Sequence, residues 1–431
     1  MVIKRDIVRL YIQRTMNRIF IAVLFLTVST QSVFVFGLNF HWLYGSNKLQ
    51  PSDVQDAQIN FAINLLQEVA KSGKSTLVSP FSIFTLLSVA YFTAHGKTKL
   101  QMGQILTGHP KTKKAEVEKY FTDFLESVTR TNCNNYTMKA ANRLYIHDDT
   151  LSDDFVLPLL YLYNGEIVHK CESFQNDAIL QDIANWTLNA TENKIGGVEM
   201  KIRKNEMLML NIINFKDEWQ IRFDRQLKKR FFHHSEKEKE AKLMMATDGT
   251  FLNYMDDLLN VLILPYASTE VQMVLILPKI RFTLASVLEK LTKEKLIECM
   301  KNAAPTKLKL VLPKFRLETK YNLEEFFKKN GVTKAFSEKA EFLMKKRQIY
   351  LTKILQGGLI QLDEVGTDIS EISTFVYRSD RSNNSEVSKL NASSYGKLKR
   401  FQPLNMFVGD QPFLYFIIKN HQTILFAGQY S

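Results

Sequence analysis

A polar segment near the C-terminus contains several basic residues. A trypsin-like serine protease could cleave the chain after any of them. The segment follows residues 361–367 and ends where apolar residues return at Phe407. Its basic side chains include Arg378, Arg381, Lys399 and Arg400. Serine and asparagine fill much of the rest, so little of it suits a buried core. A compact domain rarely holds about forty residues without structure unless they are functional or disordered, so we interpret the segment as an exposed loop.

A disordered linker between two domains is the alternative interpretation of this segment. The residues after Phe407 are too few for a second domain, and they have the continuous apolar pattern of buried strands. The loop is therefore predicted to be an insertion within one fold, offered to another molecule.

Motifs for catalysis by the chain itself are missing from the sequence. There is no Gly-x-Ser-x-Gly elbow, no His-Glu-x-x-His pair and no glycine-rich phosphate loop, so we expect neither an enzyme nor a cofactor. His233 and His234 lack cysteine or acidic partners at ligand spacing, and we interpret them as a solvated pair rather than a metal site.

Composition indicates a globular protein with a large core. The chain has 431 residues, 45% of them apolar, and a formal net charge of +13. The basic residues are scattered and form no aromatic-basic module, so nucleic-acid binding is not expected.

The N-terminus has the pattern of a secretory signal. Basic residues precede the apolar run 19–28, and small residues suited to cleavage end at Gly37. The apolar run is too short for a membrane span. We predict a signal peptide over 1–37, an extension over 38–56 and a single domain over 57–431, in an extracellular protein. Met16 is an alternative start, because a shorter signal would begin there.

Five sequons agree with secretion. They permit N-glycosylation at Asn135, Asn185, Asn189, Asn383 and Asn391. The three cysteines, Cys133, Cys171 and Cys299, are too few and too far apart for a disulfide framework or a zinc site. The sequence allows either one disulfide bridge with one free thiol or three free thiols.

Hydrophobic periodicity predicts an α+β fold, with helices first and strands dominating the second half. The pattern predicts helices over 57–69, 111–129, 175–189, 284–300 and 323–329, and an almost wholly apolar helix that Pro80 opens. Strands are predicted over 138–146, 207–215, 258–264, 273–277, 308–315, 359–362, 414–418 and 424–426.

Several of these segments together resemble the serpins, from about Ile59 to Phe426. Residues 77–83 resemble the opening of that family's buried helix, and Asn211, Phe215, Lys216 and Trp219 match its Asn-x-x-x-Phe-Lys-Gly-x-Trp signature, with Asp217 at the glycine position. Further matches follow in the family's order at residues 264–266, 273–278, 312–315 and 411–413. Each piece alone is weak, but the ordered set identifies the chain as a member of the family.

The resemblance implies a monomeric serpin fold of three β-sheets, about nine helices and an exposed reactive-centre loop, here over about residues 364–406. In inhibitory members a serine protease cleaves that loop, which then enters the largest sheet as a strand and carries the acylated protease to the far pole. Glu364, Gly366 and Thr367 match the family's hinge, where glycine eases the rotation that starts insertion.

Two features of the loop oppose efficient trapping. Family members usually have small residues after the hinge, whereas here Thr367, Ile369, Glu371 and Ser373 would face the core together, next to Ile372. A buried carboxylate costs several kcal/mol, and Ile369 demands extra volume at roughly 1–3 kcal/mol.

Length is the second feature. From Glu364 to Phe407 the chain has about nineteen residues more than the two dozen typical of the family, on the order of 60 Å of strand. Counting from Glu364 places the scissile bond near Asp380, which favours Arg378 or Arg381. Counting back from Phe407 places it near Lys399 and Arg400.

Two further groups of residues follow from the resemblance. Ser79, Ser82 and Asn211 match polar residues of the region where the sheet opens, and Gln356 replaces the family's usual histidine there, with Gly357 in place of its lysine. Binding of a sulfated glycosaminoglycan is suggested because the basic residues Lys111, Lys113 and Lys114 lie where the family's glycosaminoglycan-binding helix falls, although an ordinary solvated surface is the simpler interpretation.

Two functions remain open from the sequence. The first is a suicide inhibitor of a trypsin-like serine protease. The second is a non-inhibitory binder, carrier or sacrificial protease substrate that displays the long loop.

Overall fold

The computed structural model describes residues 51–109, 137–146, 165–169, 176–195, 206–233, 239–342, 349–378 and 406–431, with isolated positions in 115–123 and at 235. Within these residues no helix has both the length and the apolarity needed to cross a membrane. The predicted α+β organisation is confirmed, with helices leading and sheet dominating after residue 206.

A fully buried helix, α3 (Pro80–Thr93), lies at the centre of the molecule. All fourteen of its residues are buried. Pro80 begins it without losing a hydrogen bond, and Ser79 caps it by accepting a hydrogen bond from the backbone N–H of Ser82. A helix that is almost wholly apolar must be surrounded by other elements, and α3 packs between a six-stranded sheet and the surrounding helices.

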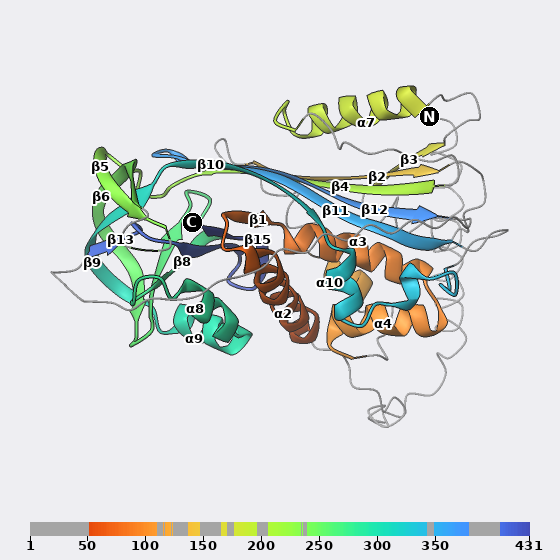
Figure 1. The fold of residues 1–431 in the computed structure, drawn as a ribbon, viewed down its shortest axis with the longest axis horizontal. Helices are drawn as coiled ribbons and strands as arrows, with labels where there is room; N and C mark the ends of the chain where they lie inside the picture. Colours follow the sequence, from red (N-terminus) through yellow and green to blue (C-terminus); the bar gives the residue numbers. More distant parts are fainter. Residues whose placement is uncertain are drawn as a thin grey trace, which may run out of the picture. The chain divides into compact units, whose positions relative to one another are not determined.

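Other helices cover the two faces of that sheet (Figure 1). On the side of α3 lie α2 (Pro51–Val69), α4 (Gly96–Thr107) and α10 (Glu324–Lys329), with the short turns η2 (Ala70–Ser72) and η4 (Lys334–Phe336). On the opposite side lies α7 (Asn176–Ala190). The predicted helix 284–300 is divided into α8 (Leu284–Lys290) and α9 (Lys293–Lys301), because Thr292 caps a new helix by accepting from the N–H of Lys295.

The six-stranded sheet contains Asn211, Gln356 and the predicted hinge residues from Gly366 onwards. Its strands lie in the order β10 (Phe315–Asn322), β11 (Tyr350–Leu362), β12 (Gly366–Arg378), β4 (Glu206–Glu218), β2 (Thr137–Ile146) and β3 (Gly165–His169). Only the β2–β3 pair is parallel, and the other neighbours are antiparallel.

The remaining strands form a nine-stranded sheet. Their order is β1 (Thr76–Val78), β15 (Thr423–Tyr430), β14 (Phe413–Lys419), β8 (Val271–Pro278), β7 (Leu259–Pro265), β6 (Lys239–Met255), β9 (Ala304–Pro313) and β13 (Met406–Val408), with β5 (Arg225–Phe232) also on β6. The seventeen-residue β6 pairs with β5, β7 and β9 along different parts of its length. β6 therefore links these strands into one sheet, so the described residues form two sheets where the resemblance implies three.

The prediction of an exposed loop from about 364 to 406 is wrong for its first part, because residues 366–378 form β12. All thirteen residues pair with β4, and β11 pairs along the other edge. The physical reason is composition: threonine, isoleucine, phenylalanine, valine and tyrosine dominate this stretch, and such residues fit a pleated, buried surface. Residues 379–405 lie outside the described part of the chain.

Gly366 has a role in this structure that the sequence analysis did not assign, and its predicted part in starting insertion stays a prediction. Its φ is not in the left-handed region, so conformational freedom does not require glycine in this state. Instead β12 begins so close to β4 that a Cβ on residue 366 would lie 2.0 Å from the carbonyl oxygen of Asp217. Glycine permits this approach of the two backbones.

The substitution Gly366→Ala tests this role of glycine. The added methyl group forces the start of β12 away from β4, and we expect the free energy of unfolding to fall by about 1–3 kcal/mol. Thermal or urea denaturation measures the change. Gly357→Ala in β11 is the matched control, because its Cβ would meet the nearest atom at 3.7 Å and should be nearly neutral. Equal stability of both variants would contradict the close approach.

Candidate functional site: the inserted strand

β12 presents one row of side chains to the core. Thr367, Ile369, Glu371 and Ser373 are all buried, with Ile369 and Glu371 fully inaccessible. The hydroxyl of Thr367 accepts a hydrogen bond of 2.8 Å from Tyr266 Oη, and Ile369 packs in the main apolar cluster. The volume that Ile369 needs is thus available inside the molecule.

The carboxyl group of Glu371 is fully buried and has no access to solvent. Ser373 Oγ donates to its Oε1 at 2.6 Å, whereas Oε2 has no hydrogen-bond partner among the described residues. Burial raises the pKa of Glu371 to about 8, against weaker opposing hydrogen bonds from Ser373, Ser82 and Gln356. Near neutral pH the group is therefore mostly protonated, and the strand holds a neutral acid rather than a buried charge.

A polar cluster surrounds this acid at the point where α3 begins. Ser82 Oγ lies 2.9 Å from Ser373 Oγ and also contacts Asn211 Oδ1. Asn211 in turn donates to Asn142 Oδ1 at 2.8 Å. The cluster joins β2, β4, β12 and α3, so the sequence-predicted residues Ser82 and Asn211 meet the inserted strand directly.

Gln356 closes the same cluster from β11. Its Nε2 donates to the carbonyl oxygen of Ser79 at 3.0 Å and to Ser373 Oγ at 3.2 Å, while its Oε1 has no partner within the described chain. Ser79 Oγ donates to the carbonyl of Leu425. Two buried acceptor atoms of this cluster, Gln356 Oε1 and Glu371 Oε2, thus have no donor among the described residues. Removal from solvent is the physical reason for the neutral form of Glu371.

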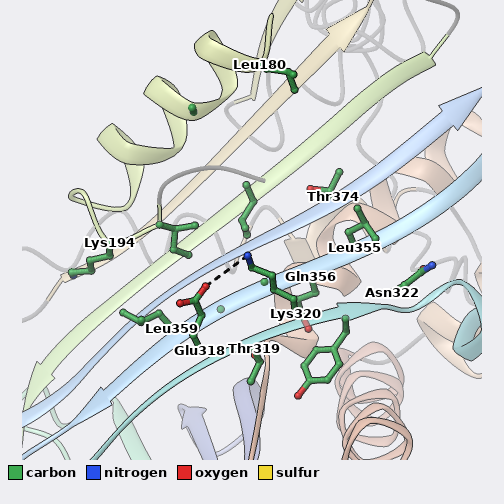
Figure 2. Close-up of a pocket in the computed structure, with 16 residues that line it drawn as sticks. Leu180, Lys194, Glu318, Thr319, Lys320, Asn322, Leu355, Gln356, Leu359 and Thr374 are labelled. Carbon is green, nitrogen blue, oxygen red and sulfur yellow. Dashed lines mark ion pairs between the residues drawn. The ribbon is translucent and has the colours of Figure 1, made fainter. Parts of the chain in front are cut away.

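The opposite row of β12 faces α7. Ser370 contacts Asn214, Ile372 packs with a small apolar cluster, and Lys194 Nζ binds Asp368 Oδ1 at 2.6 Å from the turn after α7. A cavity of about 630 Å³ lies over this face, between α7 and strands β10 to β12 (Figure 2). Gly357 helps to form it, since a side chain there would project towards Ile372.

The turn between β11 and β12 is fixed by several bonds. Glu364 forms an ion pair of 2.9 Å with Lys314 and accepts a hydrogen bond of 2.7 Å from Gln226. The hydrogen bond from Lys314 lowers the pKa of Glu364. Trp219 Nε1 donates to the carbonyl oxygen of Asp363 at 2.9 Å. The tryptophan of the sequence motif therefore anchors the hinge, a role that the sequence analysis did not assign.

Other predicted residues lie elsewhere. Arg378 is the last residue of β12, and Asn185 and Asn189 are exposed on α7. Cys299 is a buried free thiol whose pKa burial raises to about 11. Outside the described residues lie Asp380, Arg381, Lys399, Arg400, Asn135, Asn383, Asn391, Lys111, Lys113, Lys114, Cys133, Cys171 and His234.

His233 makes a contact of 3.4 Å with Glu240 through its Nε2. No group of histidine, cysteine and acidic residues that could hold a metal occurs within the described ranges.

Comparison with known proteins agrees with this architecture. The family model described as Serpin (serine protease inhibitor) matches residues 56–431. Human Serpin B8 is 30% identical over 396 residues, which are 88% of this chain and 99% of Serpin B8.

Solved structures similar to this one include two cleaved proteins, one of them described as loop-inserted. A cleaved Serpin 42Da has a TM-score of 0.77 at 22% identity, covering 88% of this chain and 98% of that one. A cleaved ovalbumin mutant with its loop inserted also has a TM-score of 0.77, at 20% identity, with coverage of 88% and 99%. These likenesses establish the fold.

The substitution Glu371→Gln tests the buried acid. The raised pKa means that Glu371 destabilises β12 progressively as pH rises from about 4.5 towards 8, and no further above it. We expect the difference in melting temperature between variant and wild type to be small at pH 5 and to grow in favour of the variant up to pH 8. At pH 7 the cost of protonation corresponds to roughly 3 kcal/mol.

Glu318→Gln on the neighbouring β10 is the control for Glu371→Gln, since Glu318 is exposed. A flat difference between Glu371→Gln and wild type across pH 5–8 would show that Glu371 is not buried.

Proposed function

Because this chain belongs to the serpin family, we propose that it is a secreted inhibitor of a trypsin-like serine protease, which it traps when its loop is cleaved. Serpins are generally protease inhibitors rather than enzymes. The observation that carries the proposal is the pairing of residues 366–378 along both edges, with β11 and with β4. The inserting segment of this chain, despite Ile369 and Glu371, fits the position that trapping requires.

The end of β12 favours Arg378 or Arg381 as the residue attacked. The inserted strand ends at Arg378, so a protease acylated there or at Arg381 is held by at most a few residues of free chain. A protease attached at Lys399 would trail about 21 residues beyond the strand, or roughly 70 Å of extended chain. Such slack lets the protease keep its structure and complete hydrolysis.

A sacrificial substrate is the second candidate function. The uptake of a proton by Glu371 makes insertion less favourable at neutral and higher pH. Slow insertion leaves time for deacylation, and the chain would then be cut without holding its protease. The N-terminal signal pattern and the sequons support secretion for either function.

Incubation with trypsin, followed by denaturing electrophoresis, separates the two functions. We expect a complex that resists SDS, and we expect it to be lost in the double variant Arg378→Ala/Arg381→Ala. The matched double variant Lys399→Ala/Arg400→Ala should retain the complex, since these residues lie after the proposed cleavage site and take no part in holding the acylated protease. Cleavage of the wild type at Arg378 or Arg381 without any complex would identify a substrate instead.

Binding of a sulfated glycosaminoglycan through Lys111, Lys113 and Lys114 remains a prediction. If these residues bind heparin, the chain elutes from immobilised heparin above physiological salt, and alanine at all three positions lowers the salt needed. Elution of the wild type below physiological salt would exclude the interaction.

A further inference from the structure

The cavity of about 630 Å³ lies on the face of the six-stranded sheet that α7 covers, on the opposite side from α3 (Figure 2). Strands β10, β11 and β12 form its floor, and α7 with the turn after it forms its wall. Its volume is within the range of about 300–1,000 Å³ that is usual for small-molecule sites. No part of the proposed function uses this cavity.

Gly357 keeps the middle of the floor open. In the register of the sheet, Lys320 of β10, Gly357 of β11 and Ile372 of β12 form one row across the three strands. A Cβ on residue 357 would lie 3.7 Å from Ile372 Cγ2 and 3.8 Å from Lys320 Cγ, so a longer side chain would enter the space between them. Because residue 357 is glycine, the cavity reaches the backbone of β11.

Most of the cavity surface is apolar. Leu355 and Leu359 line it from one face of β11, because alternate residues of a strand project to the same side. Leu180 of α7 and Ile195 of the following turn line it from the wall, and Ile372 adds to the floor. A molecule bound here would therefore bury mainly apolar surface.

One polar atom of the lining has no partner. Thr374, two residues after Ile372 on the same face of β12, is fully buried and lines the cavity (Figure 2). Its hydroxyl oxygen Oγ1 forms no hydrogen bond with any described residue. An unpaired buried hydroxyl is unfavourable, and a threonine hydroxyl can both donate and accept. Thr374 is therefore suited to bind a polar group of a ligand.

The charged residues of the cavity are paired with charges of opposite sign. On the exposed strand β10, Lys320 Nζ lies 3.9 Å from Glu318 Oε1, and Lys194 Nζ lies 2.6 Å from Asp368 Oδ1. The charges of these two pairs cancel. A charged ligand would lose its hydration without gaining an unpaired countercharge from these residues, so the lining favours a neutral ligand.

We propose that this cavity binds a neutral, mainly apolar small molecule whose one hydrogen-bonding group meets Thr374 Oγ1. The inference goes beyond the proposed function, because the site needs no protease. Ile372 and Thr374 belong to β12, so the cavity is complete only when that strand lies between β11 and β4. The ligand therefore stabilises β12 in the sheet.

Fluorescence titration with N-phenylnaphthylamine tests the proposal, because this probe is neutral, mainly apolar and has one N–H donor. The mature chain is titrated uncut and after nicking at Arg378 or Arg381. We expect saturable binding at one site wherever hydrogen exchange shows protected amides in 366–378. Anilinonaphthalene sulfonate has the same skeleton with an added negative charge, and we expect it to bind at least about ten-fold more weakly.

Two pairs of variants place the probe in the cavity. Gly357→Leu fills the space between Lys320 and Ile372 and should weaken binding at least about ten-fold, whereas Gly357→Ala should leave it nearly unchanged. Thr374→Val removes the hydroxyl and should weaken binding about five-fold, while Thr374→Ser should retain most of the affinity. The melting temperature of each variant shows whether it is folded.

Four results would overturn the proposal. They are no saturable binding in either the uncut or the nicked chain, equal affinity of wild type and Gly357→Leu, equal affinity of Thr374→Val and Thr374→Ser, and tighter binding of the sulfonate than of the neutral probe. The titration needs no trapped protease, so its outcome is independent of whether the chain is an inhibitor.

Discussion

β12 is held by hydrogen bonds on both edges, and the rest of the structure depends on this double pairing. The strand between β11 and β4 provides hydrogen-bond partners for the backbone groups of both neighbours. Without it, these groups would have to bind water, or β11 and β4 would have to pair with each other. Each such bond contributes only about 0.5–1.5 kcal/mol, but thirteen residues make them together. The polar cluster depends on this strand, which also packs against α3 and continues from the fixed hinge.

Glu371 works against the same pairing. Its carboxyl group enters a site with few donors, and it is accommodated by taking up a proton rather than by an ion pair. The surrounding hydroxyl and amide groups of Ser82, Ser373 and Gln356 reduce the cost without removing it. Strand pairing favours insertion, whereas protonation of Glu371 costs free energy that increases with pH up to about 8. Insertion is therefore sensitive to pH, as it would not be if alanines occupied these positions.

Much of this arrangement could be predicted from the sequence. The apolar residues after Pro80 predicted a buried helix, and the motif from Asn211 to Trp219 identified the family. Alternation correctly placed Glu371 and Ile369 towards the core. The state of the strand could not be predicted, because residues 366–378 suit both an exposed hinge and a buried strand. The close approach at Gly366 and the contact between Trp219 and Asp363 depend on β4 lying alongside, which no local pattern reveals.

The ionisation of Glu371 in the uncut protein tests the central claim most directly. In a chain with carboxyl-labelled glutamate, the resonance that disappears in Glu371→Gln can be assigned and followed by carbon NMR as pH is varied. The inserted strand predicts a midpoint of about pH 8 for this carboxyl. A midpoint near 4.5, the ordinary value for an exposed glutamate, would mean that β12 is not in the sheet.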